Sequence, residues 1–392
     1  MIVYICNMNK SSYKTLMQNY SAIKVSGFND RYLGYEQLKD YLDNNVFPFY
    51  SHRVIGQSEL KRSIYEVNIG KGANKILIWS QMHGNETTTT KALLDFLNYI
   101  NLNKNTSFVK ALIVKCTIKI IPMLNPDGAT VYNRLNAHNK DLNRDAIKQS
   151  QSETKAFFKV LNDFEPDYCF NMHGQRTLFS AGKADYPATL SFLSPSIDDD
   201  RSVTPTRKVG MQLISAAYEM LQDFIPNQIG RYDDAYNPNC FGDYIQSKDV
   251  PTVLFEAGHY QNDYRRNKTR QFVFLSLLKM LDVISGGELS KYNYKTYFDI
   301  PMNQKLYYDC IISGAENLYP NDVGIVYKEQ LAEESVQFKP VIDALKPLNH
   351  FYSHRFIEAK QNKLTINSQS DIKIGDTIEQ LRIADQEFDL NV

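Results

Sequence analysis

The stretch KILIWSQMHGNE (75–86) joins a short apolar run to a histidine and a glutamate. Residues 75–80 are mostly apolar and β-branched, a pattern that predicts a buried β-strand. Gly84 allows the chain to turn sharply where that strand ends. His83 and Glu86 can then point at one ion, because Zn²⁺ binds imidazole nitrogen and carboxylate oxygen at about 2.0–2.2 Å. The stretch therefore predicts a strand whose end carries part of a metal site.

Outward from this strand, short apolar runs alternate with segments of helical periodicity. Ser150 and Glu153 form a capping-box pattern, which predicts the start of one helix. Further strands are expected at 63–70, 110–124, 167–172 and 251–258, and helices at 89–100, 150–164, 206–224 and 272–285. Strands that alternate with helices predict an α/β fold, in which helices cover both faces of the sheet.

The pattern of apolar and turn residues changes near residue 290. Residues 291–392 contain short strand-like segments separated by turn residues, so we expect a small β-rich accessory domain there. Residues 1–290 are expected to form the main domain. Its first part, about 1–60, is a polar extension with one helix-like segment at 35–45.

Composition limits the partners and the compartment. The 392 residues include 44 Lys and Arg against 44 Asp and Glu, so the formal net charge is zero and we expect no nucleic acid partner and no membrane partner. Five scattered cysteines without a CxxC pair argue against a disulfide scaffold and against a cysteine zinc cluster. No apolar run reaches about 18 residues and the first residues lack a basic region, so we expect no signal peptide and a cytoplasmic protein.

Two more side chains suited to metal chemistry stand at strand ends. His173 follows the strand-like run 167–172, and Glu256 closes a later one. In open α/β sheets, ligands bind at the carboxyl ends of strands, so both residues are expected near His83 and Glu86. Two histidines and one glutamate leave the fourth position of a tetrahedral zinc open for water, which is the catalytic pattern. Glu256 would be a free carboxylate beside that water and suits a general base.

A polar stretch between these strands carries two arginines. Residues 125–128, Asn-Pro-Asp-Gly, have strong turn chemistry, and Arg134 and Arg144 follow them. An arginine fork binds a carboxylate through two hydrogen bonds, and an arginine near a metal can hold a developing oxyanion. The pattern therefore adds an anion-binding function to the predicted metal site.

These motifs occur together and in one order: His83-x-x-Glu86, Asn125-Pro-Asp-Gly128, Arg134-x-Asn136, Asp141-Leu-Asn143-Arg144, His173-Gly174 and Glu256. In this combination the chain resembles the M14 zinc carboxypeptidases, and the branch with NPDG and DLNR more than the digestive branch. The resemblance covers about residues 50–285. It implies a mixed β-sheet with helices on both faces, and a catalytic role for the main domain.

The resemblance also implies the cofactor and the reaction. His83, Glu86 and His173 would hold one zinc ion. Glu256 would be the general base on zinc-bound water and would then pass the proton to the leaving amine. The chain is thus expected to be a zinc metallopeptidase that hydrolyses a C-terminal peptide bond.

The same resemblance implies how the substrate is bound. Arg134 would polarise the scissile carbonyl and contact the substrate, and Asn143 with Arg144 would bind its terminal carboxylate. The expected partner is therefore a peptide, or a small N-acyl amino acid, with a free carboxylate. Nothing in the sequence indicates the oligomeric state.

The family also uses a mobile tyrosine upstream of the catalytic glutamate and some eight residues before an aspartate. Tyr236 lies seven residues before Asp243 and is our candidate, with Tyr232 and Tyr244 as rivals.

The chain departs from the family pattern in three places, and the substrate stays open for that reason. The gap from Glu86 to His173 is short, Ala257 follows the catalytic glutamate, and Asp145 follows the DLNR run. An N-acyl amino acid deacylase on the same scaffold is the first alternative, and cleavage of peptidoglycan-type peptides is another. From a different class, the chain could be an inactive zinc-binding or peptide-binding module.

Three further side chains have more than one interpretation. His138 lies in a polar loop and is expected to be solvated. His259 either supports the site or belongs to a loop, and Arg176 either meets an acidic group of the substrate or forms a surface salt bridge.

Overall fold

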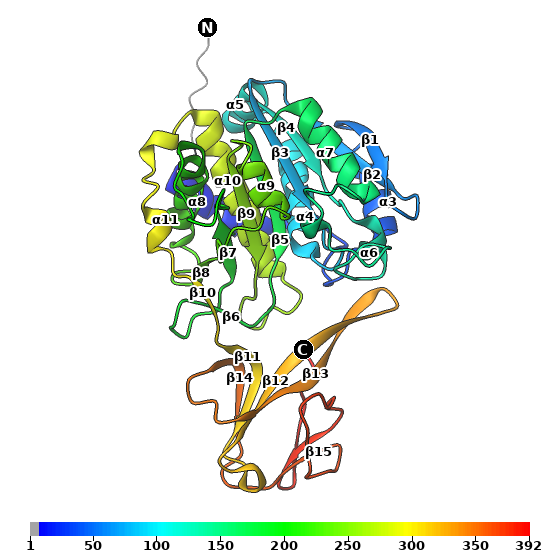
Figure 1. Cartoon of the computed structure of the whole chain (residues 1–392), viewed down its shortest axis with the longest axis vertical. Coiled ribbons are helices and arrows are strands. Elements are labelled where there is room, and N and C mark those ends of the chain that lie inside the picture. Colours follow the sequence, from blue (N-terminus) through cyan, green and yellow to red (C-terminus); the bar gives the residue numbers. More distant parts are fainter. Residues whose placement is uncertain (1–7) are drawn as a thin grey trace.

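A computed structural model describes residues 8–392 and contains a large unit above a smaller β-rich unit (Figure 1). The large unit is built around an eight-stranded sheet: β1 (Ser51–Gln57), β2 (Ser63–Ile69), β4 (Cys116–Ile121), β3 (Asn74–Ser80), β5 (Tyr168–Gly174), β9 (Thr252–Ala257), β7 (Leu190–Leu193) and β8 (Ile229–Arg231), in this spatial order. The sheet is mixed, because β1, β2 and β7 pair in the antiparallel sense. The four central strands β4, β3, β5 and β9 run parallel, so their carboxyl ends lie along one edge.

The central strands are buried on both faces, because their side chains alternate between two apolar cores. In β3, Ile76 and Ile78 belong to the larger core, whereas Leu77 and Trp79 belong to the second. The larger core is covered by α4 (Thr87–Leu102), α5 (Ser107–Lys115), α8 (Pro205–Leu221) and α10 (Asn267–Gly286), and the second by α7 (Ser152–Phe164) and α9 (Phe241–Gln246). This arrangement confirms the predicted α/β fold with helices on both faces.

The N-terminal segment packs onto the larger core. It contains α1 (Lys10–Gln18), α2 (Tyr20–Ile23) and α3 (Tyr35–Asn45), and the last of these confirms the helix expected at 35–45. Buried Asp95 on α4 holds this segment in place. It accepts hydrogen bonds from Val25 N at 2.8 Å, from the Tyr20 hydroxyl and from Arg270 Nε at 2.6 Å. An ion pair inside the core thus joins the N-terminal segment, α4 and α10.

One predicted strand is partly wrong. Residues 110–115, expected as the start of a strand over 110–124, form the end of helix α5, and the strand β4 begins at Cys116. The Thr106 hydroxyl caps this helix by accepting a hydrogen bond from Val109 N at 3.4 Å. A short apolar run fits either a buried strand or a buried helix, and the cap is the local feature that favours the helix.

Residues just beyond 290 still belong to the large unit. The shorter elements around the sheet are α6 (Pro126–Thr130), η1 (Leu142–Arg144), β6 (Phe179–Ala181), η2 (Leu289–Lys291), α11 (Thr296–Asp299) and β10 (Asn303–Lys305). Strand β10 pairs with β6, so the segment that leads into the small unit runs beside the loops of the large one.

The small unit consists of two sheets around their own apolar core, and most of their strand pairs are antiparallel. The first contains β13 (Ser335–Lys346), β12 (Asp322–Ala332), β11 (Tyr307–Ser313) and β14 (Tyr352–Glu358), and the second contains β15 (Leu364–Ile366), β16 (Leu381–Ile383) and β17 (Gln386–Phe388). The short 3₁₀ turn η3 (Glu316–Leu318) follows β11. These sheets confirm that the C-terminal part is β-rich.

The long β12–β13 hairpin reaches up to the large unit (Figure 1). Near its tip, the Glu329 carboxylate accepts hydrogen bonds from the Tyr132 hydroxyl and, at 3.4 Å, from Arg31 Nε. A second contact centres on buried Asp309, which accepts hydrogen bonds from Tyr264 at 3.0 Å and from Thr177 at 3.1 Å. The two units are therefore joined by buried polar contacts at two separate places.

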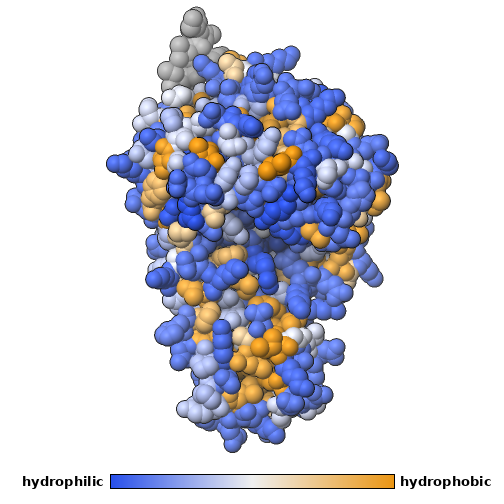
Figure 2. All heavy atoms as spheres, in the orientation of Figure 1, coloured by the Kyte–Doolittle hydropathy of each residue, from blue (hydrophilic) through white to orange (hydrophobic). Residues whose placement is uncertain are grey.

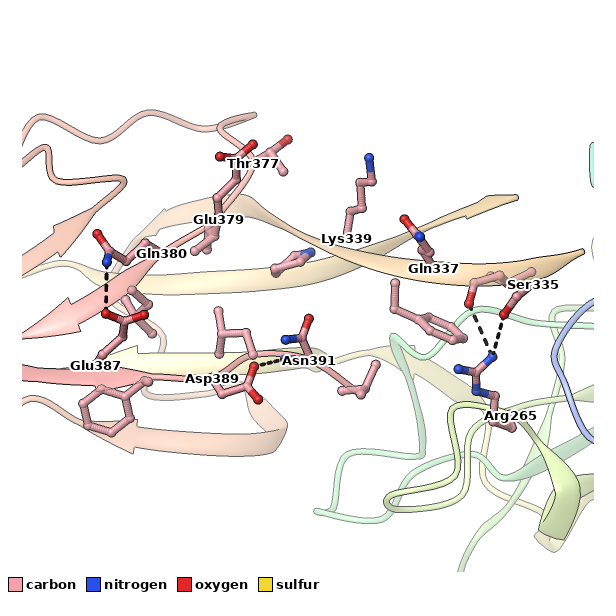
Figure 3. Close-up of a pocket in the computed structure, with 18 residues that line it drawn as sticks. Arg265, Ser335, Gln337, Lys339, Thr377, Glu379, Gln380, Glu387, Asp389 and Asn391 are labelled. Atoms are coloured by element: carbon pink, nitrogen blue, oxygen red, sulfur yellow. Dashed lines mark hydrogen bonds between the residues drawn. The ribbon is translucent and has the colours of Figure 1, made fainter. Parts of the chain in front are cut away.

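One face of the small unit carries apolar side chains (Figure 2) and a groove. Figure 2 shows apolar side chains gathered over the small unit. A groove of about 850 Å³ runs along β13 and the last residues of the chain (Figure 3). Arg265, from the large unit, closes one end of this groove and donates to Ser335 Oγ at 3.5 Å.

Within residues 8–392, no helix is long and apolar enough to cross a membrane. Four of the five cysteines lie in this range and all four are free thiols, and Cys6 lies outside it. The expectation of no signal peptide also rests partly on residues outside the described range.

Candidate metal and catalytic site

The turn after β3 has little freedom to rearrange. Gln81 adopts a positive φ of 49°, and a Cβ atom at Gly84 would lie 2.0 Å from the Gly128 carbonyl carbon. Residue 84 must therefore be glycine for the two loops to approach this closely. The turn ends at Glu86, which precedes the first residue of α4, so one short segment positions both His83 and Glu86.

Three side chains converge at the carboxyl ends of β3 and β5. His83 Nδ1 lies 2.8 Å from Glu86 Oε1, and His173 Nδ1 lies 2.9 Å from Glu86 Oε2. The two Nδ1 atoms are 3.2 Å apart. Ligand atoms about 2.0–2.1 Å from one ion at tetrahedral angles lie roughly 3.3 Å from each other. The donor set and its spacing therefore fit a zinc ion held by His83, Glu86 and His173, in agreement with the sequence prediction.

Asp141 fixes the orientation of His83. Its Oδ1 lies 3.0 Å from His83 Nε2, and its Oδ2 accepts a hydrogen bond from Arg134 NH2 at 3.0 Å. A carboxylate on the second nitrogen of a metal-binding histidine selects the tautomer and strengthens the ligand. The sequence analysis assigned no role to Asp141, although its place in the Asp-Leu-Asn-Arg run could have indicated one.

The charges around the three ligands favour binding of a cation. Burial opposes ionisation of Glu86, but the neighbouring His83 and His173 hold the pKa of its carboxyl well below the usual range. Burial lowers the pKa of His173, so this imidazole stays neutral, as a metal ligand must. Burial also acts against the charged form of His83, yet Glu86 and Asp141 raise the pKa of that ring.

Glu256 lies beside the metal ligands on the next strand. It pairs in register with His173 across β5 and β9, and its Oε2 atom is buried without a hydrogen-bond partner. Burial, together with the negative charge of Glu86, raises the pKa of the Glu256 carboxyl well above its usual range. A buried carboxyl with a raised pKa can exchange a proton near neutral pH.

The predicted substrate-binding residues surround the same space. Arg134 forms ion pairs with Glu86 at 3.3 Å and with Asp141 at 3.0 Å. Asn143 Oδ1 accepts a hydrogen bond from Phe241 N at 2.9 Å, which fixes the amide. Arg144 donates to the Asn143 carbonyl at 2.7 Å and to Cys240 Sγ at 3.1 Å, and it forms no ion pair within residues 8–392. Its guanidinium therefore keeps donors free for an anion.

A cavity of about 470 Å³ joins these groups. Seven of the eight predicted site residues line it: His83, Glu86, Arg134, Asn143, Arg144, His173 and Glu256. The eighth, Tyr236, does not line it, whereas its rival Tyr232 does. Burial and the carboxylates of Glu256 and Glu86 raise the pKa of Tyr232, whereas burial and the carboxylate of Asp243 raise the pKa of Tyr236. The catalytic role of Tyr236 stays a prediction, and Tyr232 is the tyrosine that the structure brings to the site.

Three other side chains have positions that the sequence left open. Asp127 accepts hydrogen bonds from Ser58 and Leu60, so it fixes a turn. His138 is largely exposed, as expected for a loop residue. His259 is buried at the junction of the two units, with its ring 4.2 Å from that of His354, and does not line the cavity.

Comparisons with known proteins agree with this geometry. Residues 39–244 match the family model Peptidase_M14, described as zinc carboxypeptidase. Carboxypeptidase 2 from Trichophyton tonsurans is 32% identical over 117 residues, 29% of this chain and 21% of that protein. Gamma-D-glutamyl-L-diamino acid endopeptidase 1 from Lysinibacillus sphaericus is 33% identical over 92 residues, 22% of this chain and 23% of that protein.

The chain thus spans about a fifth of the length of these curated relatives. A crystal structure of carboxypeptidase A from Helicoverpa armigera has a similar fold, with a TM-score of 0.52 at 16% identity over 71% of this chain and 80% of that one.

Proposed function

Because the chain belongs to the zinc carboxypeptidase family, we propose that it hydrolyses the C-terminal peptide bond of a substrate with a free carboxylate. The observation that carries this proposal is the convergence of four groups in one cavity. His83, Glu86 and His173 offer a tetrahedral donor set, and Glu256 lies next to it with a buried oxygen that has no partner. Two histidines and one carboxylate form an open, catalytic zinc site and not a closed structural one.

We assign each side chain of this cavity a separate role in hydrolysis. His83, Glu86 and His173 would hold a zinc ion, which would supply a Lewis acid for the carbonyl and for water. Glu256 removes the proton from the attacking water and returns it to the leaving amine. Arg134 lines the same cavity, and its donors would stabilise the negative charge that develops on the carbonyl oxygen.

Asn143 and Arg144 make the proposed reaction an exopeptidase reaction. Arg144 has no carboxylate partner within the described residues, and it lines the cavity that holds the metal ligands. A guanidinium fork binds the α-carboxylate of the last residue through two hydrogen bonds. The scissile bond is then fixed one residue from the end of the substrate.

One comparison supports a second candidate reaction. The similarity to a gamma-D-glutamyl-L-diamino acid endopeptidase extends the proposal to peptides of peptidoglycan type, which the same catalytic groups can cleave. The deacylase of N-acyl amino acids remains an alternative on the same scaffold. Turnover measured on C-terminal peptides, γ-glutamyl peptides and N-acyl amino acids separates the three.

The first experiment tests the general base. Glu256→Gln replaces the carboxyl by an amide of the same shape, so zinc content should stay near that of the unchanged protein. Turnover should fall by about 10²–10⁴-fold, the usual contribution of a general base. Full turnover in this variant would remove Glu256 from the mechanism. If the variant and the parent both bind zinc and neither cleaves any peptide, the inactive binding module becomes the better description.

The second experiment tests the carboxylate anchor. Arg144→Ala should slow cleavage of free-acid peptides, while their C-terminally amidated counterparts, already poor substrates, should change little. An equal loss for both would show that Arg144 has another role. Lys148→Ala, at an exposed site four residues away that does not line the cavity, is the matched control.

A further inference from the structure

The catalytic cavity contains two cations that the proposed reaction does not use. Arg176 and Lys305 line the cavity, and both side chains are exposed to solvent. Within residues 8–392, neither side chain forms an ion pair or a hydrogen bond. Unpaired cations inside a cleft attract anions, because the low-dielectric walls focus their field.

Hydrogen bonds of a neighbouring side chain, Gln175, connect the two segments that carry these residues. Arg176 follows His173 by three residues, and the buried Gln175 between them donates to the Ala188 carbonyl at 2.8 Å. The same Gln175 side chain accepts a hydrogen bond from Asn303 Nδ2 at 2.9 Å, which ties the loop to the first residue of β10. Lys305, the last residue of β10, is thereby fixed relative to the end of β5.

Strand β6, which pairs with β10, completes the side of the cavity that carries Arg176 and Lys305. This side is called the second wall below. Lys305 lies directly opposite Phe179, and the Phe179 ring is 5.8 Å from the ring of Tyr232, which lines the same cavity. The wall therefore combines an aromatic surface with two positive charges. It is built from segments that follow β5 and precede β11.

This wall is separate from the carboxylate anchor. Asn143 and Arg144 hydrogen-bond to Phe241 and Cys240, at the start of α9, and within residues 8–392 neither hydrogen-bonds to the segments that carry Arg176 and Lys305. The anchor would hold the residue that leaves, so cations apart from it suit the part of the substrate that keeps the acyl carbon.

The acids of the cavity do not neutralise this wall. Glu86 and Glu256 belong to the metal and base positions described above. Asp233 also lines the cavity, but its carboxylate lies 3.7 Å from Arg201, which does not line it, and Asp243 lies on α9 beside the anchor. Among the described residues, neither cation forms an ion pair with an acid of the cavity.

We propose that Arg176 and Lys305 form a subsite for a carboxylate on the acyl side of the scissile bond. The proposal rests on the proposed peptidase function and specifies its substrate class. An arginine fork and a lysine together match one carboxylate. Two kinds of peptide place a carboxylate there: one with an α-linked Glu or Asp as the penultimate residue, and one with a γ-linked glutamyl residue, whose α-carboxylate is free.

The test compares matched peptides with the zinc-loaded full chain. Acetylated tripeptides share the C-terminal residue and differ only in the penultimate one, which is α-Glu, Gln, γ-L-Glu or γ-D-Glu. We expect kcat/KM to be at least tenfold higher for an acidic member than for the Gln peptide. The member with the highest value distinguishes the α-linked from the γ-linked source. Equal rates for the acidic and the Gln peptides would overturn the proposal.

Variants assign the preference to residues. Arg176→Gln and Lys305→Gln should each reduce the acid-over-Gln ratio about tenfold, and raised salt should reduce it further. Lys183→Gln, at an exposed position beside β6 that does not line the cavity, should keep the ratio of the unchanged chain. If both cavity variants kept the ratio, the subsite would lie elsewhere and the proposal would fail.

A binding measurement separates failure of the subsite from failure of the proposed function. Calorimetry with zinc-loaded Glu256→Gln measures affinity for the same peptides without turnover. Tighter binding of an acidic peptide, lost in the double variant with Arg176→Gln, supports the subsite even if the parent chain cleaves no peptide. Equal affinities overturn the subsite, whatever the turnover of the parent chain.

Discussion

Asp243 should destabilise the fold at neutral pH, and its replacement by asparagine should stabilise it. This carboxyl lies on α9 and is only 8% exposed. Burial raises its pKa from the ordinary value of 3.8 to about 6, although Asn237 N donates a hydrogen bond to it and Arg144 and Arg207 favour its charged form. The folded chain therefore holds this proton more tightly than the unfolded chain does.

The direction of the pH effect follows from this difference. Between about pH 4 and pH 6 the folded state binds more protons at this site, so stability falls as pH rises through that window. Above the window the loss is constant. A rise from 3.8 to about 6 corresponds to about 3 kcal/mol, since each pKa unit is worth about 1.4 kcal/mol. This figure is the upper limit of the gain from Asp243→Asn, whose carbonyl oxygen can still accept from Asn237 N.

Urea unfolding at several pH values measures the effect. At pH 8, with the same free zinc concentration for both proteins, Asp243→Asn should raise the free energy of unfolding by about 1–3 kcal/mol. The gain should shrink steadily below pH 6 and fall to about a third of its full value at pH 4.5. Asp199→Asn, at an exposed position, should change stability by less than about 0.5 kcal/mol. A less stable Asp243→Asn protein at pH 8, or a gain that does not depend on pH, would refute the argument.

Three other substitutions test the framework of the site. Asp95→Asn breaks the buried pair with Arg270 and should cost about 3–5 kcal/mol in urea unfolding, because it leaves a buried cation without its charge partner. Gly84→Ala places a Cβ atom against the Gly128 carbonyl and should lower zinc content, measured on protein whose circular dichroism is unchanged. Glu329→Gln removes the charge that holds the hairpin tip and should speed proteolysis within β12–β13, and equal cleavage rates for variant and parent would contradict that role.

The positions of the proposed metal ligands and of Glu256 could be predicted because each is fixed by local features. His83, His173 and Glu256 stand at the ends of short apolar runs, and parallel strands end at one edge of a sheet. Their spacing along the chain is then irrelevant, since the sheet brings them together. The family motif adds the order of the residues, and the structure adds the distances between their atoms.

Local features did not determine which tyrosine lines the cavity. They also did not determine whether residues 110–115 form a strand or a helix. Tyr232 and Tyr236 lie four residues apart in one irregular loop, and a count of residues to Asp243 does not determine which ring turns toward the cavity. Residues 110–115 are apolar enough for either a strand or a helix. In both cases the answer depends on tertiary contacts that no local pattern contains.

The contacts between the small unit and the cavity could not be predicted from local patterns either. The pattern of short strand-like segments indicates a β-rich C-terminal part. It does not indicate that this part contacts the loops that carry Arg134 and Arg176. Glu329 binds Tyr132, two residues before Arg134, and Asp309 binds Thr177, the residue after Arg176. Each contact ties a loop that carries an arginine of the cavity to the small unit. A chain cut after β10 would keep every proposed zinc ligand and lose the contacts that hold both loops.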